Sequence, residues 1–495
     1  MNPELAIPLA LLAPVLGAVG IALTGKHPNL RESVTLICAA VTFVLVASLF
    51  DNVMAGERPE WTFLEMLPGL SIMFRIEPLG MVFAGVASFL WIVTTIYAIG
   101  YMRGHNEQNQ TRFYICFAIA IASALGIAFA GNMLTLFVFY EVLTLSTFPL
   151  VTHAGTPEAK RAGRIYLGIL IGTSIGLQLV AVVWTYTLTG TLDFTTGGIL
   201  RGQASDAVVA VLLAMYVFGI GKAALMPFHR WLPAAMVAPT PVSALLHAVA
   251  VVKAGVFTVL KITVYIFGID FLTELGSSEW LQYMAASTIL IASLIAMRQD
   301  NLKARLAYST ISQLSYIVLA AMLANSLSIV GGGMHIVMHA FGKITLFFCA
   351  GAILVASHKT EISQMRGLGK TMPFTMIAFV FGSLSIIGLP PFGGLWSKWY
   401  IALGALQAGQ LVMVAVLMIS SLLNIAYLLP IPFHAFFSKP VATLSEDDHG
   451  HADDNTIHEA PWPCLLAISV TALGSLLLFF FPAPLFNLLN QIFSH

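Results

Sequence analysis

One acidic and four basic side chains stand inside long apolar stretches of this sequence. Residues 134–150 read LTLFVFYEVLTLSTFPL, and the single charged residue among them is Glu141. Four amines share this kind of setting: Lys222, Lys253, Lys343 and Lys398. Because a bare charge in hydrocarbon costs several kcal/mol, each of these groups must face protein or water and find a partner.

Ionisable groups inside a membrane have three ordinary uses: binding a charged substrate, carrying protons or sensing voltage. Voltage sensing requires regularly spaced arginines on one helix, whereas the four lysines lie on four different predicted helices. Burial favours the neutral form of a lysine and a nearby carboxylate favours its charged form, so a small movement can release a proton. We therefore interpret Glu141 and Lys222 as a candidate pair, and the other three lysines as the continuation of a proton path.

Further polar residues extend this path. His335, His339 and Lys343 are spaced i, i+4, i+8 and so share one helix face, and histidine titrates near neutral pH. His247 precedes Lys253 by six residues and lies on another face of the same helix. The tenth predicted span adds a polar group: Ser309, Ser312, Gln313 and Tyr316. A single histidine or serine in a membrane helix more often bonds a neighbouring helix, and this structural interpretation stands beside the proton path.

Long apolar runs recur from one end of the chain to the other. Of the 495 residues, 58% are hydrophobic and 9% are charged, whereas soluble domains carry roughly 25% charged residues. Runs of about 20 apolar residues predict membrane-spanning helices. We therefore expect an all-α polytopic membrane protein with about fourteen spans, near residues 5–24, 33–51, 77–100, 112–130, 132–150, 161–188, 206–236, 241–266, 281–297, 303–325, 329–356, 373–402, 409–437 and 461–485.

The seventh and twelfth predicted spans contain helix breakers. One reads GIGKAALMPFHRWLPAAMVAPTP and the other SIIGLPPFGGLWSKWY, and proline interrupts a helix. Irregular backbone at membrane depth is tolerated only where protein or water satisfies it, so the breaks indicate an ion site. Their spacing suggests two inverted five-helix repeats, spans 4–8 and 9–13. The expected domains are 1–111, 112–266, 281–437 and 461–495.

The basic residues are unevenly divided between alternate loops. Most of them fall in one set of loops, and the other set holds only Arg58, Arg75, Arg201 and Lys261. The positive-inside rule places the richer set in the cytoplasm and both termini outside. The first apolar run has no basic n-region and no cleavage motif, so we interpret it as a membrane helix rather than a signal peptide.

Signals for cofactors are missing. The four cysteines (Cys38, Cys116, Cys349 and Cys464) lie in apolar runs without CxxC or metal spacing. No iron–sulfur, haem or nucleotide fingerprint occurs. The loop SEDDHGHADDNTIHE (445–459) contains His449, His451 and His458, and we interpret it as a solvated cytoplasmic loop rather than a metal site. We expect no cofactor, no bound metal and no nucleic-acid partner.

The stretch GKAALMPFHRWLPAAMVAPTPVSALLHAVAVVKAGV resembles the signature of the antiporter-like subunits. These subunits are shared by respiratory complex I, membrane-bound hydrogenases and Mrp-type multisubunit cation/proton antiporters, and the resemblance covers about residues 70–440. It implies that Glu141 matches the fifth-helix glutamate, Lys222 and Lys253 the seventh- and eighth-helix lysines, and Lys398 the twelfth-helix terminal residue. His335, His339 and Lys343 match the polar row of the eleventh helix.

Two further segments, FYEVLTLSTFPLVTHAGTPEAKRAGRIYL and GLPPFGGLWSKWY, resemble the D subunit of Mrp antiporters. The resemblance implies a non-enzymatic, proton-translocating subunit of a monovalent cation (Na+)/H+ antiporter in the inner (plasma) membrane. Its partners would be subunits like Mrp A, B, C, E, F and G. A pumping subunit of a redox complex, such as complex I or a hydrogenase, would carry the same membrane residues and is the alternative.

Two other classes fit the sequence less well. A standalone transporter would need a substrate pocket at the breaks, and a structural scaffold would not need five buried charges. The five ionisable residues lie on five different predicted helices, and we expect each of them near mid-depth of the membrane. We therefore expect protons to move laterally, from helix to helix, before they cross the membrane.

Overall fold

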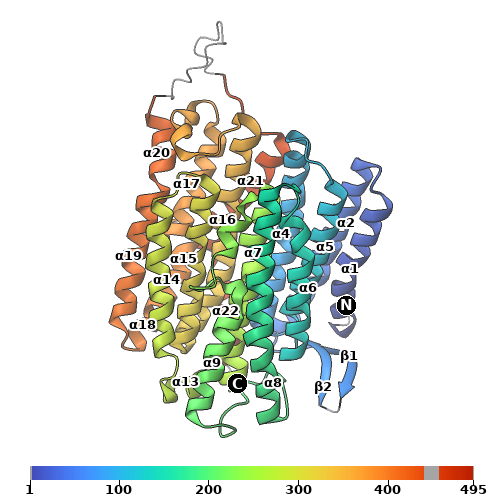
Figure 1. Ribbon diagram of the computed structural model, residues 1–495, viewed down its shortest axis with the longest axis vertical. Helices are drawn as coiled ribbons and strands as arrows, with labels where there is room; N and C mark the ends of the chain where they lie inside the picture. Colours follow the sequence, from blue (N-terminus) through green and yellow to red (C-terminus); the bar gives the residue numbers. More distant parts are fainter. Residues whose placement is uncertain (1–2, 68, 440–455, 494–495) are drawn as a thin grey trace.

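A computed structural model describes residues 3–67, 69–439 and 456–493 of the chain. The described part is a bundle of helices that run along its long axis, with a two-stranded hairpin at one end (Figure 1). The first half contains α1 (Pro3–Leu23), α2 (Pro28–Ala47), α3 (Phe50–Met54), β1 (Glu60–Leu67), β2 (Leu70–Arg75), α4 (Pro78–Gly104), α5 (Gln110–Ala128), α6 (Met133–Val151), α7 (Pro157–Thr173), α8 (Val180–Thr189), α9 (Asp206–Gly219), α10 (Trp231–Ala234), α11 (Thr240–Ala244), α12 (Val251–Ile262) and α13 (Ile269–Leu275). The second half contains α14 (Glu279–Met297), α15 (Leu302–Leu323), α16 (Ser326–Ser357), α17 (Pro373–Ile387), α18 (Gly394–Gln407), α19 (Leu411–Leu428), α20 (Pro430–Phe437), α21 (Trp462–Phe480) and α22 (Ala483–Asn490).

Twelve helical segments of the described chain are long and apolar enough to cross a membrane. Two shorter apolar helices, α9 and α17, begin the predicted seventh and twelfth spans. Twelve and two make the fourteen spans that the sequence predicts, and the all-α polytopic membrane fold is confirmed. The inverted repeats and the domain boundaries stay predictions.

Local signals set where several helices begin. A side-chain oxygen of Asn132, Thr156 or Asn325 accepts a hydrogen bond from a backbone N–H in the first turn of α6, α7 or α16, respectively. Such caps satisfy donors that the helix itself leaves unpaired. They fix the start of two helices, α6 and α16, that carry Glu141 and Lys343.

The centre and the rim of the bundle differ in what they bury. In the segment 240–267, which contains α11 and α12, the whole apolar window is buried, and in α15 94% of it is buried. In the segment 28–54, which contains α2, only 28% is buried. Ile37 and Val44 are exposed in this segment, as is Leu16 in the neighbouring α1. The rim therefore presents an apolar surface suited to lipid, and the centre is shielded from it.

The hairpin was not expected from the sequence. Strand β1 pairs antiparallel with β2, within a stretch whose sequence indicates only a polar connection. Met73 donates its backbone N–H to Thr135 Oγ1 at 2.9 Å, and Asn132 Nδ2 donates to the carbonyl of Ser71 at 2.7 Å. These bonds attach the hairpin to the start of α6.

Lys261 was wrongly assigned to an outer loop. It lies in α12, its side chain has no exposed surface, and its Nζ is 2.9 Å from Glu77 Oε1. The helix continues beyond it through a π-helical turn, Thr263–Phe267. The bundle therefore buries a fifth lysine, and this one has a carboxylate beside it.

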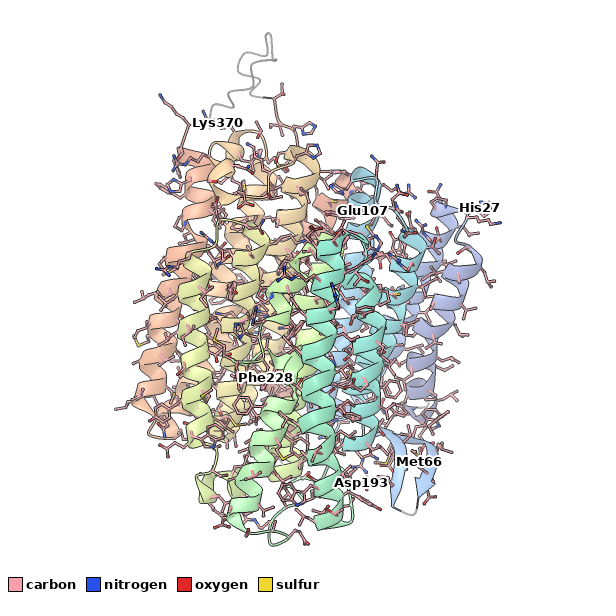
Figure 2. All side chains as sticks on the ribbon, viewed as in Figure 1. His27, Met66, Glu107, Asp193, Phe228 and Lys370 are labelled. Atoms are coloured by element: carbon pink, nitrogen blue, oxygen red, sulfur yellow. The ribbon has the colours of Figure 1, made fainter. Side chains whose placement is uncertain are left out.

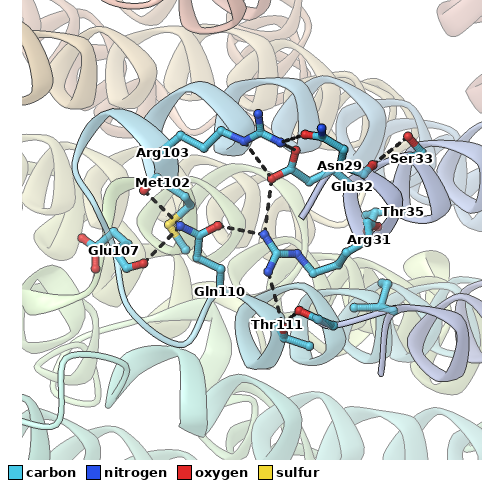
Figure 3. Close-up of polar contacts among 12 residues, drawn as sticks. Asn29, Arg31, Glu32, Ser33, Thr35, Met102, Arg103, Glu107, Gln110 and Thr111 are labelled. Carbon is cyan, nitrogen blue, oxygen red and sulfur yellow. Dashed lines mark hydrogen bonds and ion pairs between the residues drawn. The ribbon is translucent and has the colours of Figure 1, made fainter. Parts of the chain in front are cut away.

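A second buried group of charges joins α2 to α4 and α5, and we call it the Glu32 clamp (Figure 3). Glu32 forms ion pairs with Arg31 and Arg103. Arg31 also donates to Gln110 Oε1 at 2.8 Å and to Thr111 Oγ1 at 3.2 Å. The clamp consists of these five residues. It ties the peripheral helix α2 to the bundle through ion pairs and hydrogen bonds.

Both ends of the described chain lie toward the hairpin end (Figure 1). Gln491 Nε2 donates to the carbonyl of Met54 at 2.7 Å, which holds the C-terminal turn beside α3. An even number of spans brings both ends of the chain to the same face of the membrane. Which face is outside stays a prediction, and the loop interpretation falls largely on residues 440–455, which lie outside the described residues.

Candidate functional site

The seventh span is broken at Lys222. Helix α9 ends at Gly219, and a single 3-10 turn (Gly221–Ala223) carries the lysine. Gly255 of α12 packs on this turn so closely that a Cβ there would lie 2.3 Å from the carbonyl carbon of Lys222. Figure 2 shows Phe228, which follows the break, between Lys370 at one end and Met66 at the other. The broken turn at Lys222 is therefore buried in the bundle, where protein groups satisfy its backbone.

The Lys222 ammonium is held by neutral groups of α6. Its Nζ donates to the carbonyl of Tyr140 at 2.9 Å and to Thr144 Oγ1 at 2.5 Å. It also lies 3.2 Å from the centroid of the Tyr140 ring, a distance at which a cation is attracted to the ring face. The lysine is fully buried, so α6 supplies its whole polar environment.

Glu141 is the neighbour of Tyr140 but does not contact Lys222 directly. Its carboxylate oxygens are buried, and they accept no hydrogen bond from the part of the chain that the structure describes. The pair that we expected is therefore an adjacency on one helix turn, not a direct ion pair. A carboxylate in this state needs a donor from water or from a partner.

Lys253 and the two histidines of α16 lie next to one another. Lys253 Nζ lies 2.6 Å from His339 Nδ1, and the His339 and His335 rings are 5.7 Å apart. His335 Nδ1 hydrogen-bonds Ser397 Oγ at 2.8 Å. These contacts lead from α12 through α16 to α18, where Ser397 stands next to Lys398.

Lys398 lies in α18, just after the second break, and its side chain reaches back to the end of α17. Its Nζ donates to the carbonyls of Ile386 and Ile387, at 2.8 and 3.0 Å, where α17 ends. It lies 4.9 Å from the centroid of the Tyr316 ring, which stacks on His335 at 5.7 Å. The orphaned carbonyls at the end of a helix carry negative partial charge, which suits an ammonium group.

Lys343 belongs to a separate branch. Its Nζ donates to Ser309 Oγ at 2.6 Å. The Ser309 hydroxyl lies 2.8 Å from the Tyr427 hydroxyl, and Tyr427 donates its single proton to Asn424 Oδ1 at 2.5 Å. This branch runs from α16 through α15 to α19.

Two predicted path residues are not brought into these contacts. Ser312 hydrogen-bonds Ser293 of α14 at 2.9 Å, which supports the helix–helix interpretation for this residue. His247 lies in a π-helical turn (Leu245–Val249) with its ring 4.6 Å from that of Phe347. Its two ring nitrogens have no hydrogen-bond partner in the described chain. Single π turns occur often at functional sites.

Several polar partners were missed by the sequence analysis. Thr144 is three residues after Glu141 and so lies on the same helix face, a signal that was available. Ser397 directly precedes Lys398 and could also have been found. Tyr140 and Tyr427 carry no such signal, because tyrosines are common in apolar helices that pack on one another.

We call Lys222, Lys253, Lys343 and Lys398 the buried amine row. Three of them have no exposed surface and Lys398 is 8% exposed. Their hydrogen-bond partners within the described chain are hydroxyls, carbonyls and one imidazole. No group of three possible metal ligands occurs among the described residues. The arrangement of amines, hydroxyls and an imidazole can hold and pass protons.

The sequence profile of the family described as "NADH:quinone oxidoreductase/Mrp antiporter, TM" matches residues 130–424. The N subunit of the NADH-quinone oxidoreductase of Desulforudis audaxviator is 34% identical over 409 residues, which cover 81% of this chain and 80% of that protein. The A/B subunit of a probable K(+)/H(+) antiporter of Rhizobium meliloti is 30% identical over 425 residues, which cover 83% of this chain but 41% of that protein.

Solved structures agree on the fold. A chain of the Mrp complex from Dietzia sp. DQ12-45-1b superposes with a TM-score of 0.87 at 23% identity, over 99% of this chain and 97% of that one. A chain of the membrane-bound sulfane sulfur reductase, an archaeal respiratory membrane complex, superposes with a TM-score of 0.83 at 25% identity, over 99% of this chain and 96% of that one.

The match to the family profile covers more than half of the chain and includes every residue of the amine row. The chain belongs to the NADH:quinone oxidoreductase/Mrp antiporter transmembrane family.

Proposed function

We propose that this chain is the proton-translocating subunit of a multisubunit Na+/H+ antiporter, and that the buried amine row carries the protons. The observation that carries the proposal is the chemistry around the four amines. Each is buried among neutral hydrogen-bond partners in the described chain. Because no carboxylate of the described chain forms a direct ion pair with these four amines, burial opposes their charged form and an ammonium can give up its proton.

The contacts suggest an order of transfer. The Glu141 carboxylate would stabilise a proton beside Lys222. The Nζ of Lys222 donates to the carbonyl of Tyr140, the residue before Glu141. Lys253 would exchange a proton with His339 across 2.6 Å, and His335 and Ser397 would lead to Lys398. Gaps between these contacts would be bridged by water, which is nearly as good a hydrogen-bond partner as a protein group. The path would run in the membrane plane because its members come from different helices.

A pumping subunit of a redox complex is the second candidate. The relative from Desulforudis is named as part of a quinone oxidoreductase and is matched over 80% of its length, whereas the antiporter protein from Rhizobium is matched over 41%. Purification of the complex from its native membrane in mild detergent separates the two. Small Mrp-type subunits support the antiporter, and flavin or iron–sulfur subunits would support the pump.

The transport test uses inside-out vesicles that contain the assembled complex, with a dye that reports the pH gradient. Addition of Na+ should collapse the gradient in wild type, and K+ serves as the comparison. Glu141→Gln should abolish the response while the complex still assembles. The matched control is Glu158→Gln, because Glu158 is an exposed carboxylate in the first turn of α7. A near-normal response from Glu141→Gln would contradict the proposal.

A further inference from the structure

A polar cavity of about 210 Å³ lies at the hairpin end of the bundle, apart from the amine row. Its polar lining includes Arg58, Arg75, Glu77, Lys261 and Tyr265. Glu77 and Lys261 are buried, whereas Arg58 and Arg75 are half-buried and Thr196 at the cavity is exposed. A water molecule takes up roughly 30 Å³ in the liquid, so the cavity has room for several.

The floor of the cavity is the ion pair between Glu77 and Lys261. Lys261 Nζ lies 2.9 Å from Glu77 Oε1 and donates to the carbonyl of Ala130 at 2.7 Å. Glu77 is 7% exposed, and its protein neighbours are the Lys261 ammonium and the Tyr265 hydroxyl. A carboxylate has two oxygens with about four acceptor sites, so two neighbours leave some of them open. Water in the cavity can donate to the open sites, so Glu77 is placed to exchange protons with that water.

An aromatic pair separates this cavity from the amine row. Lys253, Phe257 and Lys261 are spaced i, i+4, i+8 on α12, so they share one face. The two lysines are about 12 Å apart along the helix axis. The Phe257 ring centroid is 5.3 Å from Lys261 Nζ and 5.1 Å from the ring of Phe83, and both rings are fully buried. The two rings form an apolar barrier between two buried amines.

We propose that this cavity is a proton port of the hairpin-end face, and that the Phe83–Phe257 pair is its gate to the amine row. The inference rests on the proposed function. A proton passes from cavity water to the Glu77 carboxylate, which leaves Lys261 without its counter-charge. The Lys261 ammonium then releases its proton, through water admitted when Phe257 swings aside, to a neutral Lys253. The reverse order carries a proton outward.

The gate is tested by Phe257→Ala in vesicles containing the assembled complex, without Na+ or K+. With the ring removed, water connects the port to Lys253, and the passive proton permeability should rise several-fold above wild type. The matched control is Phe379→Ala, because Phe379 is an equally buried phenylalanine of α17. The double variant Phe257→Ala/Lys253→Met should lose the leak, since the proton then has no acceptor beyond the gate. A Phe257→Ala complex as proton-tight as wild type would overturn the gate.

The port is tested by the double variant Glu77→Gln/Lys261→Met, which removes both charges together and leaves no unpaired ion. Cation-driven proton exchange should fall several-fold, and the Phe257→Ala leak should fall with it. An unchanged exchange rate would overturn the port. These results are separable from the proposed function. If the amine row carries no protons, Lys253→Met alone keeps normal exchange; if only the port is wrong, Lys253→Met is inactive and the port variant is active.

Discussion

The Glu32 clamp and the buried amine row place charges in the same apolar bundle in opposite ways. In the clamp, one carboxylate meets two guanidinium groups, and Arg31 finds further acceptors on Gln110 and Thr111 (Figure 3). In the row, four amines meet neutral oxygens and one imidazole nitrogen. The clamp pairs its guanidinium groups with a carboxylate, whereas the hydrogen-bond partners of the row in the described chain are neutral.

This difference teaches what each region is suited to do. The folded protein is strongly destabilised when one partner of a buried ion pair is removed, because the other charge stays buried and unpaired. A buried amine among neutral partners is held less firmly in its charged form, because burial opposes the charge that hydrogen bonds support. Mutations should therefore separate stability from transport, and four predictions test this separation.

The largest effect should come from Lys253→Met, which removes the amine between the gate and His339. Transport by the assembled complex should fall to the level of empty vesicles, because the contact from α12 to α16 is lost. Stability should not fall, since the change orphans no buried carboxylate and replaces one long side chain by another. Transport in vesicles and thermal unfolding in detergent measure the two effects. Normal transport by the Lys253→Met complex would contradict the transport role of the amine row.

Lys222 should depend on proton release, not on charge alone. Lys222→Ala should block transport, and Lys222→Arg should not restore it fully, because a guanidinium stays protonated at any accessible pH. Lys359→Arg is a suitable control in the loop after α16. The same vesicle assay compares the three complexes. A fully active Lys222→Arg complex would show that Lys222 acts as a fixed charge.

The clamp should show the reverse pattern. Glu32→Gln leaves Arg31 buried without its carboxylate, so we expect unfolding to become easier by about 1.5–3 kcal/mol, the usual worth of a hydrogen bond to a charged group. Transport per assembled complex should stay near wild type, because the clamp touches none of the row. Thermal unfolding and transport normalised to complex measure this. Loss of transport at unchanged stability would assign the clamp to the proton path.

The smallest effect should come from an exposed ion pair outside the membrane spans. Arg201 and Glu274 form two hydrogen bonds, and the guanidinium lowers the pKa of Glu274. A lowered carboxyl pKa adds stability at neutral pH that is lost as the pH falls through the folded-state pKa. Because both groups are exposed, that contribution is screened. The unfolding temperature of Arg201→Gln should therefore match wild type at neutral and at acidic pH.

The sequence by itself determined the spans, the two breaks and the identity of the row. Apolar run length predicts a span directly, and Pro227 and Pro391 mark the breaks without any reference to neighbouring helices. The spacing of His335 and His339 also placed them on one face correctly, since helical periodicity is local. The sequence did not predict the hairpin, because strand alternation in a short segment of mixed polarity is a weaker signal than a long apolar run.

Only the tertiary structure decided which groups meet. Lys343 shares a face with His339 but bonds Ser309, and Lys222 bonds Thr144 rather than Glu141. Lys261 finds Glu77 from a distant part of the chain. Such pairings depend on how each helix is rotated and how closely it packs, as at Gly255, where the absence of a Cβ lets α12 rest on the Lys222 turn. Periodicity fixes a face relative to its own helix axis, and packing of all the helices together decides what that face meets.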